Sequence, residues 1–547
     1  MTKPGSLRTV VLLAGLAWVL AGPGAAAADK PFVFAILGKG SIPPLGSLEA
    51  YTTQRLAIEA QILEGLVRFD PQDPEKLLPN LAAQYFIIDP KTFVFRLRPD
   101  AFFHPFPDHP EDRVTAEDVK FSLDLARKST SPLAYLLEDV DSIQTVGRDL
   151  VKIKLRQPNK SFLSILATSI GHVTSKQYYE SLGRDEATRM AAFGQIPVGT
   201  GPYQLQGRLA LGSKAVVLER FTGYRDRHWV LSQDAISQVE FRLYEEPKEI
   251  VKGILVGDIA MASLPLTSYA DDGAFRGWEG TLTTLNPPFL VLLAINTSKE
   301  RLRNPKIRQL LNVAVEKHKL MRICPSDLDE LPASFRFYME IPQEDTSDAS
   351  DNDHLRRLLA QPGIKQSVEN LHTSGPLTIL VMDRPDHIVD AILASVAGDL
   401  KRNLGLDVRI LRSPSVNREV VASLNPDLTY AEWTPDTPWE HGNLAILESL
   451  FKSTSFSNIA LYSDLQVESL LADASRDNGQ ESTDVASKKI QARLRETAPL
   501  IWLPSVRHRV LLLNKGYQAT YSSEVNGGTS SSLIHFTSLL KDVRRRP

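Results

Sequence analysis

The chain has 547 residues, 43% hydrophobic and 23% charged, with a formal net charge of −3. This length exceeds what one hydrophobic core usually supports, so we expect two or three domains, and the apolar fraction excludes a disordered chain. The weakly acidic balance argues against a nucleic-acid partner, which would favour a basic face.

The first 28 residues have the pattern of a cleaved export signal. Lys3 and Arg8 precede an apolar run over 10–20, and a tract of small residues follows it. This run is shorter than the roughly 20 residues that a membrane helix needs. We therefore expect residues 1–28 to be removed and the mature protein to be periplasmic. The single cysteine, Cys324, lies far from the cleavage site, so we expect neither a lipid anchor nor an internal disulfide.

The first predicted elements of the mature chain are a strand, a loop and a helix. The apolar stretch PFVFAIL (31–37) predicts a short strand, and a loop rich in Gly, Pro and Ser follows at 38–47. Apolar residues then recur at helical spacing, which predicts a helix over 56–69.

Strands dominate the next segment. The turn at 89–92 separates two strand-like runs, and the second run alternates between apolar and polar residues. Residues 114–126 predict a helix that Thr115 caps, because acidic residues follow the cap and suit the positive end of a helix. Alternation over 139–156 predicts a hairpin.

Two glycines and two prolines lie close together in IPVGTGPY (196–203). A phosphate-binding loop needs Gly-Lys-Ser/Thr at the start of a helix, whereas Gly201 is followed by Pro202 and a strand-like run. The stretch is therefore no nucleotide-binding loop. We expect Gly199 and Gly201 to adopt left-handed dihedrals in a tight turn.

The second half of the chain predicts further alternation of strands and helices. An apolar run at 288–297 predicts a strand covered on both faces, and a basic amphipathic helix follows at 304–321. The acidic, Ser-rich segment 341–353 is typical of an exposed loop. Residues 376–412 predict a β-α-β unit with parallel pairing, and 483–505 a helix followed by a buried strand. The whole pattern predicts an α/β protein of two lobes.

We find no catalytic or metal-binding pattern. The chain lacks both the Gly-x-Ser-x-Gly elbow of hydrolases and the His-Glu-x-x-His helix of zinc enzymes. His104 and His109 lie near acidic residues, but prolines surround them and set no ligand geometry, so we expect a solvated loop. We therefore expect no enzymatic activity, no cofactor and no metal.

Several motifs, in chain order, resemble the bacterial extracellular solute-binding proteins of family 5, which are peptide- and nickel-binding receptors of ABC importers. They are ILEGLVRFD (62–70), LLPNLAAQYFIIDPKTFVFRLRPDAFFH (77–104), VTAEDVKFSLDLA (114–126), PVGTGPYQL (197–205), PKIRQLLNVAVEKHKL (305–320) and ETAPLIWLPS (496–505).

The resemblance implies a periplasmic-binding-protein-like α/β fold, in which two lobes made of three sub-domains close on a central cleft. On this basis we expect a lobe 1 core domain formed by 29–68, 196–286 and 508–547. A lobe 1 accessory domain would span 69–195, and lobe 2 would span 287–507.

The resemblance also implies where the ligand binds. In peptide-binding members an aspartate of the second lobe pairs with the α-ammonium group of the ligand, and the matching segment here is 428–439. Asp436 is our candidate for this role, with Glu432 as its rival; capping of the next turn is the structural alternative for Asp436. The other candidate ligand contacts are Tyr430, Trp433, Trp439 and Ser41, the last in the loop of the opposite lobe.

These inferences favour a periplasmic receptor that captures peptides or similar small solutes and delivers them to an ABC permease in the inner membrane. Within this class a nickel chelate, heme, an oligosaccharide or an opine remain alternative ligands. A secreted hydrolase is the alternative from another class, and a sensor or chaperone with the same clamp is a third. We expect a monomer with no nucleic-acid partner.

Overall fold

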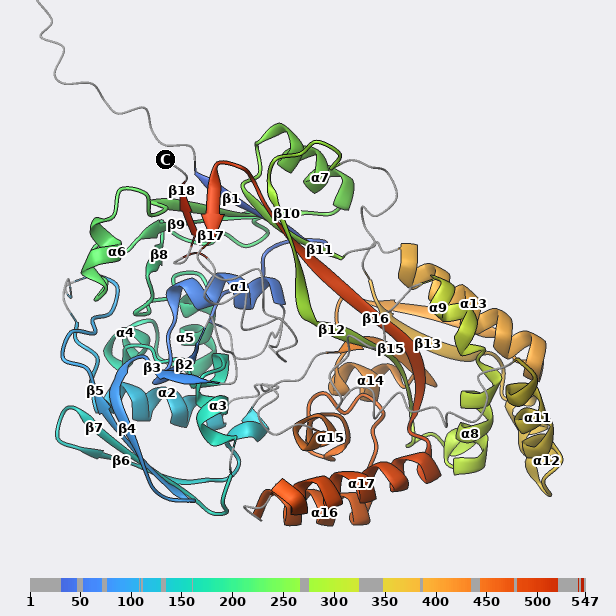
Figure 1. Ribbon diagram of the computed structural model, residues 1–547. Helices are drawn as coiled ribbons and strands as arrows, with labels where there is room; N and C mark the ends of the chain where they lie inside the picture. The colour runs from blue at the N-terminus through green and yellow to red at the C-terminus, as the bar shows by residue number, and fades with distance from the viewer. Residues whose placement is uncertain are drawn as a thin grey trace, which may run out of the picture. The chain divides into compact units, whose positions relative to one another are not determined.

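The fold was determined as a computed structural model, which describes residues 31–46, 53–70, 76–107, 109, 112–128, 134–159, 161–265, 275–323, 348–383, 387–433, 443–476, 480–519, 540 and 543–545. Strands and helices alternate along most of the chain (Figure 1). The strands are β1 (Phe32–Leu37), β2 (Val67–Phe69), β3 (Leu77–Pro79), β4 (Ala82–Asp89), β5 (Thr92–Leu97), β6 (Val140–Val146), β7 (Leu150–Leu155), β8 (Tyr203–Leu205), β9 (Ala215–Arg220), β10 (Gln238–Tyr244), β11 (Met261–Pro265), β12 (Thr281–Ile295), β13 (Leu377–Met382), β14 (Val408–Ser413), β15 (Leu428–Trp433), β16 (Leu500–Leu513), β17 (Tyr517–Ala519) and β18 (Val543–Arg545).

The helices lie between these strands. The α-helices are α1 (Thr53–Ile62), α2 (Ala116–Lys128), α3 (Phe162–Leu166), α4 (Lys176–Ser181), α5 (Glu186–Phe193), α6 (Arg227–Leu231), α7 (Pro247–Val256), α8 (Pro305–Ala314), α9 (Lys317–Ile323), α11 (Asp348–Leu359), α12 (Ile364–Thr373), α13 (His387–Leu404), α14 (Arg418–Leu424), α15 (Asn443–Phe451), α16 (Leu465–Arg476) and α17 (Gln480–Thr497). Short 3₁₀ turns are η1 (Ala134–Leu137), η2 (Ser169–Gly171) and η4 (Glu300–Leu302).

The largest sheet has ten strands in the order β14-β13-β15-β12-β16-β11-β1-β10-β9-β8. At one end β13 pairs in parallel with both β14 and β15, and at the other β1 pairs in parallel with β10 and β11. Two long antiparallel strands, β12 and β16, join these halves and lie side by side in Figure 1. A separate four-stranded sheet has the order β4-β5-β7-β6.

Several predicted elements are confirmed. The β-α-β unit consists of β13, α13 and β14, with parallel pairing from Leu377–Val408 to Met382–Ser413. The hairpin predicted over 139–156 is β6–β7, and the two strand-like runs on either side of the turn at 89–92 are the paired strands β4 and β5. The predicted helix start before α2 is also correct. The Thr115 hydroxyl acts there as a donor: it donates to the Asp118 carboxylate at 2.6 Å, and the Thr115 backbone N–H donates to the same oxygen at 2.9 Å.

Two predictions of local structure are wrong. The helix predicted over 56–69 ends at Ile62, because the next residues pack against α3: a Cβ on Gly65 would collide with the backbone of Leu166. The segment 341–353 is helical from Asp348 onward, where α11 begins; residues 341–347 lie outside the described residues. Tertiary packing explains α11, since two of its leucines lie in the hydrophobic core.

Separate hydrophobic cores cover the two faces of the main sheet. Along β12, Leu293 packs in one core with α8 and α13, whereas Leu292 and Ala294 pack in another with α15 and α17. All three side chains are fully buried, which confirms the prediction of a strand covered on both faces. Along β1, Phe32 and Phe34 belong to a core that continues into α1, α2 and the four-stranded sheet.

None of the helices in the described ranges combines the length and the apolar character that crossing a membrane requires.

Candidate functional site

The glycine turn is held by His104. The backbone N–H of Gly199 donates to Nδ1 of this histidine at 3.3 Å, and Nε2 donates to the carbonyl of Gly201 at 3.0 Å. Burial lowers the pKa of His104 to about 4, so the ring is neutral, and only a neutral ring has the acceptor that this contact needs. The turn therefore binds an imidazole of its own chain, and the expectation of a solvated loop is wrong for His104, which is 3% exposed.

The glycines of the turn are needed for close approach. Neither Gly199 nor Gly201 has a positive φ angle, so the expectation of left-handed dihedrals is wrong. A Cβ on Gly199 would collide with the carbonyl of Ile62, and one on Gly201 with that of Gln61. The N–H of Gly201 donates to the Ile62 carbonyl at 2.8 Å, so the turn lies directly on the end of α1.

A buried ion pair between Glu64 and Arg225 also holds the glycine turn, through Thr200. Glu64 accepts two hydrogen bonds from the Arg225 guanidinium at 2.5 and 2.7 Å, and one each from the hydroxyls of Thr200 and Tyr224. Burial alone would raise the pKa of Glu64, but the Arg225 charge and these hydrogen bonds together lower it. Because protein donors saturate the carboxylate, this network stabilises the fold.

The predicted ligand segment lies at the carboxyl end of β15. Since β13 and β15 are parallel, with Ile379 beside Leu428, Asp383 at the end of β13 lies level with Glu432. The Lys39 ammonium, in the loop after β1, forms an ion pair with Asp383 at 3.1 Å. Ligands of open α/β sheets bind outside the carboxyl ends of parallel strands, and this ion pair brings the loop that contains Ser41 to that edge.

The predicted ligand contacts differ in how the structure places them. Ser41 is exposed in the loop after β1, and Glu432 is half-buried. Tyr430 is 3% exposed and belongs to the core beneath β15, and its hydroxyl donates to Glu432 Oε1 at 3.2 Å. Trp433 is the last residue of β15, where its backbone lies opposite Leu290 of β12. Asp436 and Trp439 lie outside the described residues, and all six assignments stay predictions.

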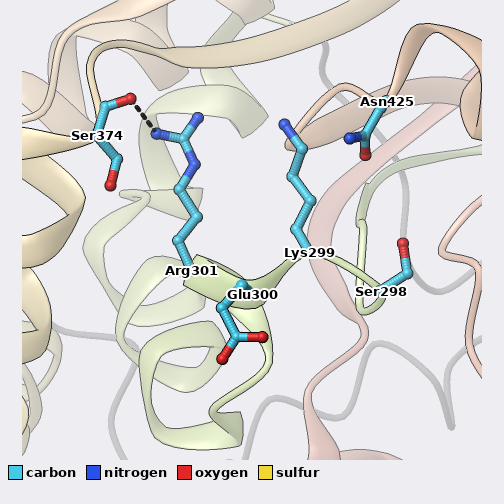
Figure 2. Close-up of a pocket in the computed structure, with 6 residues that line it drawn as sticks. All are labelled: Ser298, Lys299, Glu300, Arg301, Ser374 and Asn425. Atoms are coloured by element: carbon cyan, nitrogen blue, oxygen red, sulfur yellow. Dashed lines mark hydrogen bonds between the residues drawn. The ribbon is translucent and has the colours of Figure 1, made fainter.

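A cavity of about 500 Å³ lies at the opposite end of β15, roughly 17 Å of strand away from Trp433. Figure 2 shows Lys299 and Arg301 extending in the same direction from one turn, with Asn425 on the side of Lys299 and Ser374 on that of Arg301. Arg301 Nη1 donates to the backbone carbonyl of Ser374 at 3.2 Å.

Both cations of this cavity are engaged by Asp427. This fully buried carboxylate accepts from Lys299 Nζ at 3.1 Å, from Arg301 Nε at 2.7 Å and from the hydroxyl and N–H of Thr378. Burial would raise the pKa of Asp427, but the hydrogen bonds from Arg301 and Thr378 lower it. We interpret this network as structural, because it joins the ends of β12, β13 and β15. The edge of the sheet at the carboxyl ends of β13 and β15 therefore remains the better candidate for ligand binding.

Within the described ranges, no group of three or more His, Cys, Asp or Glu side chains is arranged to hold a metal ion. His109 instead lies 2.8 Å from the Gln177 side-chain nitrogen. The expected absence of a metal stays a prediction.

The sequence model of the bacterial extracellular solute-binding proteins, family 5, matches residues 76–455. The chain belongs to this family. It is 26% identical over 507 residues to the peptide transport periplasmic protein SapA of Salmonella typhimurium, with 87% of each chain covered. Its fold is similar to that of the murein tripeptide binding protein MppA of Escherichia coli, with a TM-score of 0.74 and 20% identity over 95% of this chain and 99% of that one. The same TM-score of 0.74, at 18% identity over 94% and 98% of the chains, relates it to DppA of Helicobacter pylori in complex with the peptide STSA.

The structure of this family 5 solute-binding protein confirms the expected fold, a periplasmic-binding-protein-like α/β fold with sheets and helices in several sub-domains. It also explains an arginine of the motif at 305–320. Arg308 is 4% exposed and donates to the carbonyls of Thr497, Leu302 and Arg303 at 2.6–2.8 Å. This side chain thus joins α8 to the end of α17.

Sequence reasoning missed Lys39 and Asp383. One signal for Asp383 was available, because this residue directly follows the predicted strand of the β-α-β unit, at the edge where ligands of such sheets bind. Lys39 lies in the same loop as Ser41, but no local pattern indicates that it contacts a residue 344 positions later.

Proposed function

We propose that this solute-binding protein captures a peptide or peptide-like solute in the periplasm and delivers it, chemically unchanged, to the permease subunits of an ABC importer. The observation that carries the proposal is the ion pair between Lys39 and Asp383, which brings the loop after β1 to the carboxyl ends of β13 and β15. The peptide-related names of SapA, MppA and DppA support the ligand class.

Capture would proceed by closure of two lobes. The proposed lobe 1 consists of a core domain (29–68, 196–286 and 508–547) and an accessory domain (69–195), and lobe 2 spans 287–507. The hydrophobic cores support the division between the lobes, because Ile501 and Leu503 of β16 pack in a core of lobe 2, whereas Leu511 to Leu513 of the same strand pack in cores of lobe 1. A ligand that contacts both lobes stabilises the closed form, since only that form makes all its contacts.

In this proposal the Asp436 carboxylate pairs with the α-ammonium group of the peptide. Glu432 is the alternative partner, and Trp433, Trp439 and Ser41 line the remaining surface. Tyr430 contributes from the core only through its hydroxyl, which donates to Glu432. Hydrogen bonds from the peptide main chain would run along the segment after β15, as in a strand added to a sheet.

The proposed receptor changes no covalent bond, works without cofactor or nucleic acid, and acts as a monomer in the periplasm after removal of residues 1–28. A secreted hydrolase would instead convert its ligand. A nickel chelate, heme, an oligosaccharide or an opine would fit the same clamp, and the experiment below separates these ligands from peptides.

Thermal unfolding of the mature protein tests the ligand class. A pool of tripeptides to pentapeptides at 100 times its dissociation constant should stabilise the protein by about 2.7 kcal/mol, and mass spectrometry should recover the peptides intact. Stabilisation by a nickel–histidine chelate, heme, a sugar or an opine without any response to peptides would contradict the peptide assignment. A cleaved product would show an enzyme.

The variant Asp436→Ala tests the ammonium contact. A charge-assisted hydrogen bond contributes about 1.5–3 kcal/mol, so we expect calorimetry to give about a ten- to hundredfold weaker peptide affinity. Asp407→Ala serves as the control, because Asp407 forms a surface ion pair with Lys401 and its side chain is 71% exposed. Equal peptide affinities of the two variants would remove Asp436 from the site.

A further inference from the structure

Lys452 makes a second contact between the proposed lobes. It directly follows α15, and its ammonium group forms an ion pair with Glu138, which directly follows η1 and lies 314 residues earlier. The same ammonium bonds Glu448, one helical turn back on α15, at 3.0 Å. Lys452 thus lies between a carboxylate of its own helix and one from the accessory domain.

The elements on the two sides of this ion pair pack in different hydrophobic cores. On the accessory-domain side, Leu137 and Ile165 pack in the core of lobe 1. On the other side, Leu447 and Phe451 pack in the core around α15 and α17. A cavity of about 40 Å³, large enough for a water molecule, remains beside Lys452. Each side of this contact has a complete hydrophobic core of its own, and the contact between them is polar and incompletely packed. The two sides can therefore separate without disrupting either core.

This ion pair is better shielded than the one between Lys39 and Asp383. The side chains of Lys452 and Glu138 are 21% and 37% exposed, against 43% and 45% for Lys39 and Asp383. Shielding from water strengthens an ion pair, so the Lys452 contact should contribute more to holding the lobes together.

The charges around Lys452 make the contact depend on this one residue. Three carboxylates surround it, those of Glu138, Asp139 and Glu448, and the Arg156 guanidinium lies on the accessory-domain side. Burial raises the pKa of Asp139, as do Glu138 and Glu448, whereas Lys452 lowers it. Without Lys452 the carboxylates of the two sides would repel one another.

We propose that Lys452 is an electrostatic latch, whose ion pair with Glu138 holds the accessory domain against lobe 2 and favours the closed form of the protein. The inference rests on the proposed function, because it requires lobes that open and close around a ligand. It adds a residue outside the ligand site that sets ligand affinity.

Distance measurements on the ligand-free protein test the latch. Single-molecule fluorescence would use dyes on Gln144→Cys and Gln366→Cys, two exposed positions on the accessory domain and lobe 2, in a Cys324→Ser background. We expect Lys452→Met to lower the closed-to-open ratio about fivefold, the upper range for a partly exposed ion pair. Glu138→Gln, which changes the other side of the contact, should act in the same direction.

Salt and a matched lysine provide the controls. Raising the ionic strength should open the wild-type protein but have a smaller effect on Lys452→Met, whose latch is already absent. Lys401→Met removes a lysine whose partner, Asp407, lies on the same lobe, so it should leave the distances unchanged. Wild-type distances and salt response in both Lys452→Met and Glu138→Gln would overturn the latch.

Peptide affinity separates the latch from the proposed function. If the tripeptide-to-pentapeptide pool binds the wild type, Lys452→Met should weaken its affinity by the factor by which the closed fraction of the ligand-free protein falls, because binding then has to supply closure. Absence of any peptide binding would contradict the proposed function, whereas the distances of the ligand-free variants would still decide the latch.

Discussion

At the scale of single residues, His104 connects two motifs that lie 95 positions apart in the sequence. Its imidazole accepts from Gly199 and donates to Gly201, and its backbone N–H donates to the Gly199 carbonyl at 2.7 Å. Protonation would remove the acceptor, so the charge of this side chain and the geometry of the turn are linked. The family motif around His104 is therefore explained by the fold.

This linkage predicts a pH-dependent stability. Burial lowers the pKa of His104 from 6.5 to about 4, so between these values the unfolded chain binds a proton that the folded chain does not. The free energy of unfolding should therefore fall as the pH is lowered from 6.5 towards 4, by about 3 kcal/mol from this residue. Urea unfolding at several pH values measures the effect.

The variant His104→Gln isolates the contribution of this residue, because glutamine does not titrate. Its stability deficit relative to the wild type should be largest above pH 6.5 and should shrink by about 3 kcal/mol near pH 4. A deficit that is constant with pH would show that the pKa of His104 is not lowered in the folded protein.

At the scale of elements, the structure shows why local patterns predict some helices and strands better than others. The β-α-β unit is predictable because the residues that pack in one hydrophobic core recur every second position in β13 and at helical spacing in α13. The helix predicted over 56–69 is too long because Leu66 follows Ile58 and Ile62 at the same interval of four residues, as it would on one face of a helix. Leu66 is indeed buried, at 1% exposed, but it lies in the turn that leads to β2 and not in the helix.

The candidate site was predictable only in part. Ser41 and Glu432 follow from the resemblance to the family, and their roles in binding stay predictions. The ion pair between Lys39 and Asp383 could not be predicted, since these residues are separated by 344 positions and their contact depends on how the elements pack. The same holds for Lys452 and Glu138, whose contact joins two hydrophobic cores.

Two glycines in different elements should respond in opposite ways to alanine. Gly201→Ala would push a methyl group into the Gln61 carbonyl, so we expect a loss of about 1–3 kcal/mol, as for other overpacked sites. Gly398 lies exposed within α13, with no atom close to its Cβ position, and Gly398→Ala should stabilise the helix by about 1 kcal/mol. Urea midpoints that move in the same direction for both variants would contradict this packing argument.

At the scale of the whole molecule, two strands join the proposed lobes. β12 has 15 residues and β16 has 14, and their ladder is interrupted between the pairs Leu285–Arg509 and Phe289–Arg507. Pro287 lies in this gap and is followed by a second proline, and prolines have no N–H for a ladder hydrogen bond. The interruption coincides with the proposed lobe boundaries, which makes it the expected hinge.

Hydrogen exchange tests whether this interruption is the hinge. The amides of Leu285, Phe289 and Arg507 should exchange faster than those of Leu292 and Leu293, whose side chains are fully buried in the cores of lobe 2. A bound peptide that holds the lobes closed should slow exchange at the interruption, because fewer molecules then visit the open form, and should leave Leu292 and Leu293 unchanged. Protection that is uniform along β12 and β16, with and without ligand, would mean that the lobes do not move about these strands.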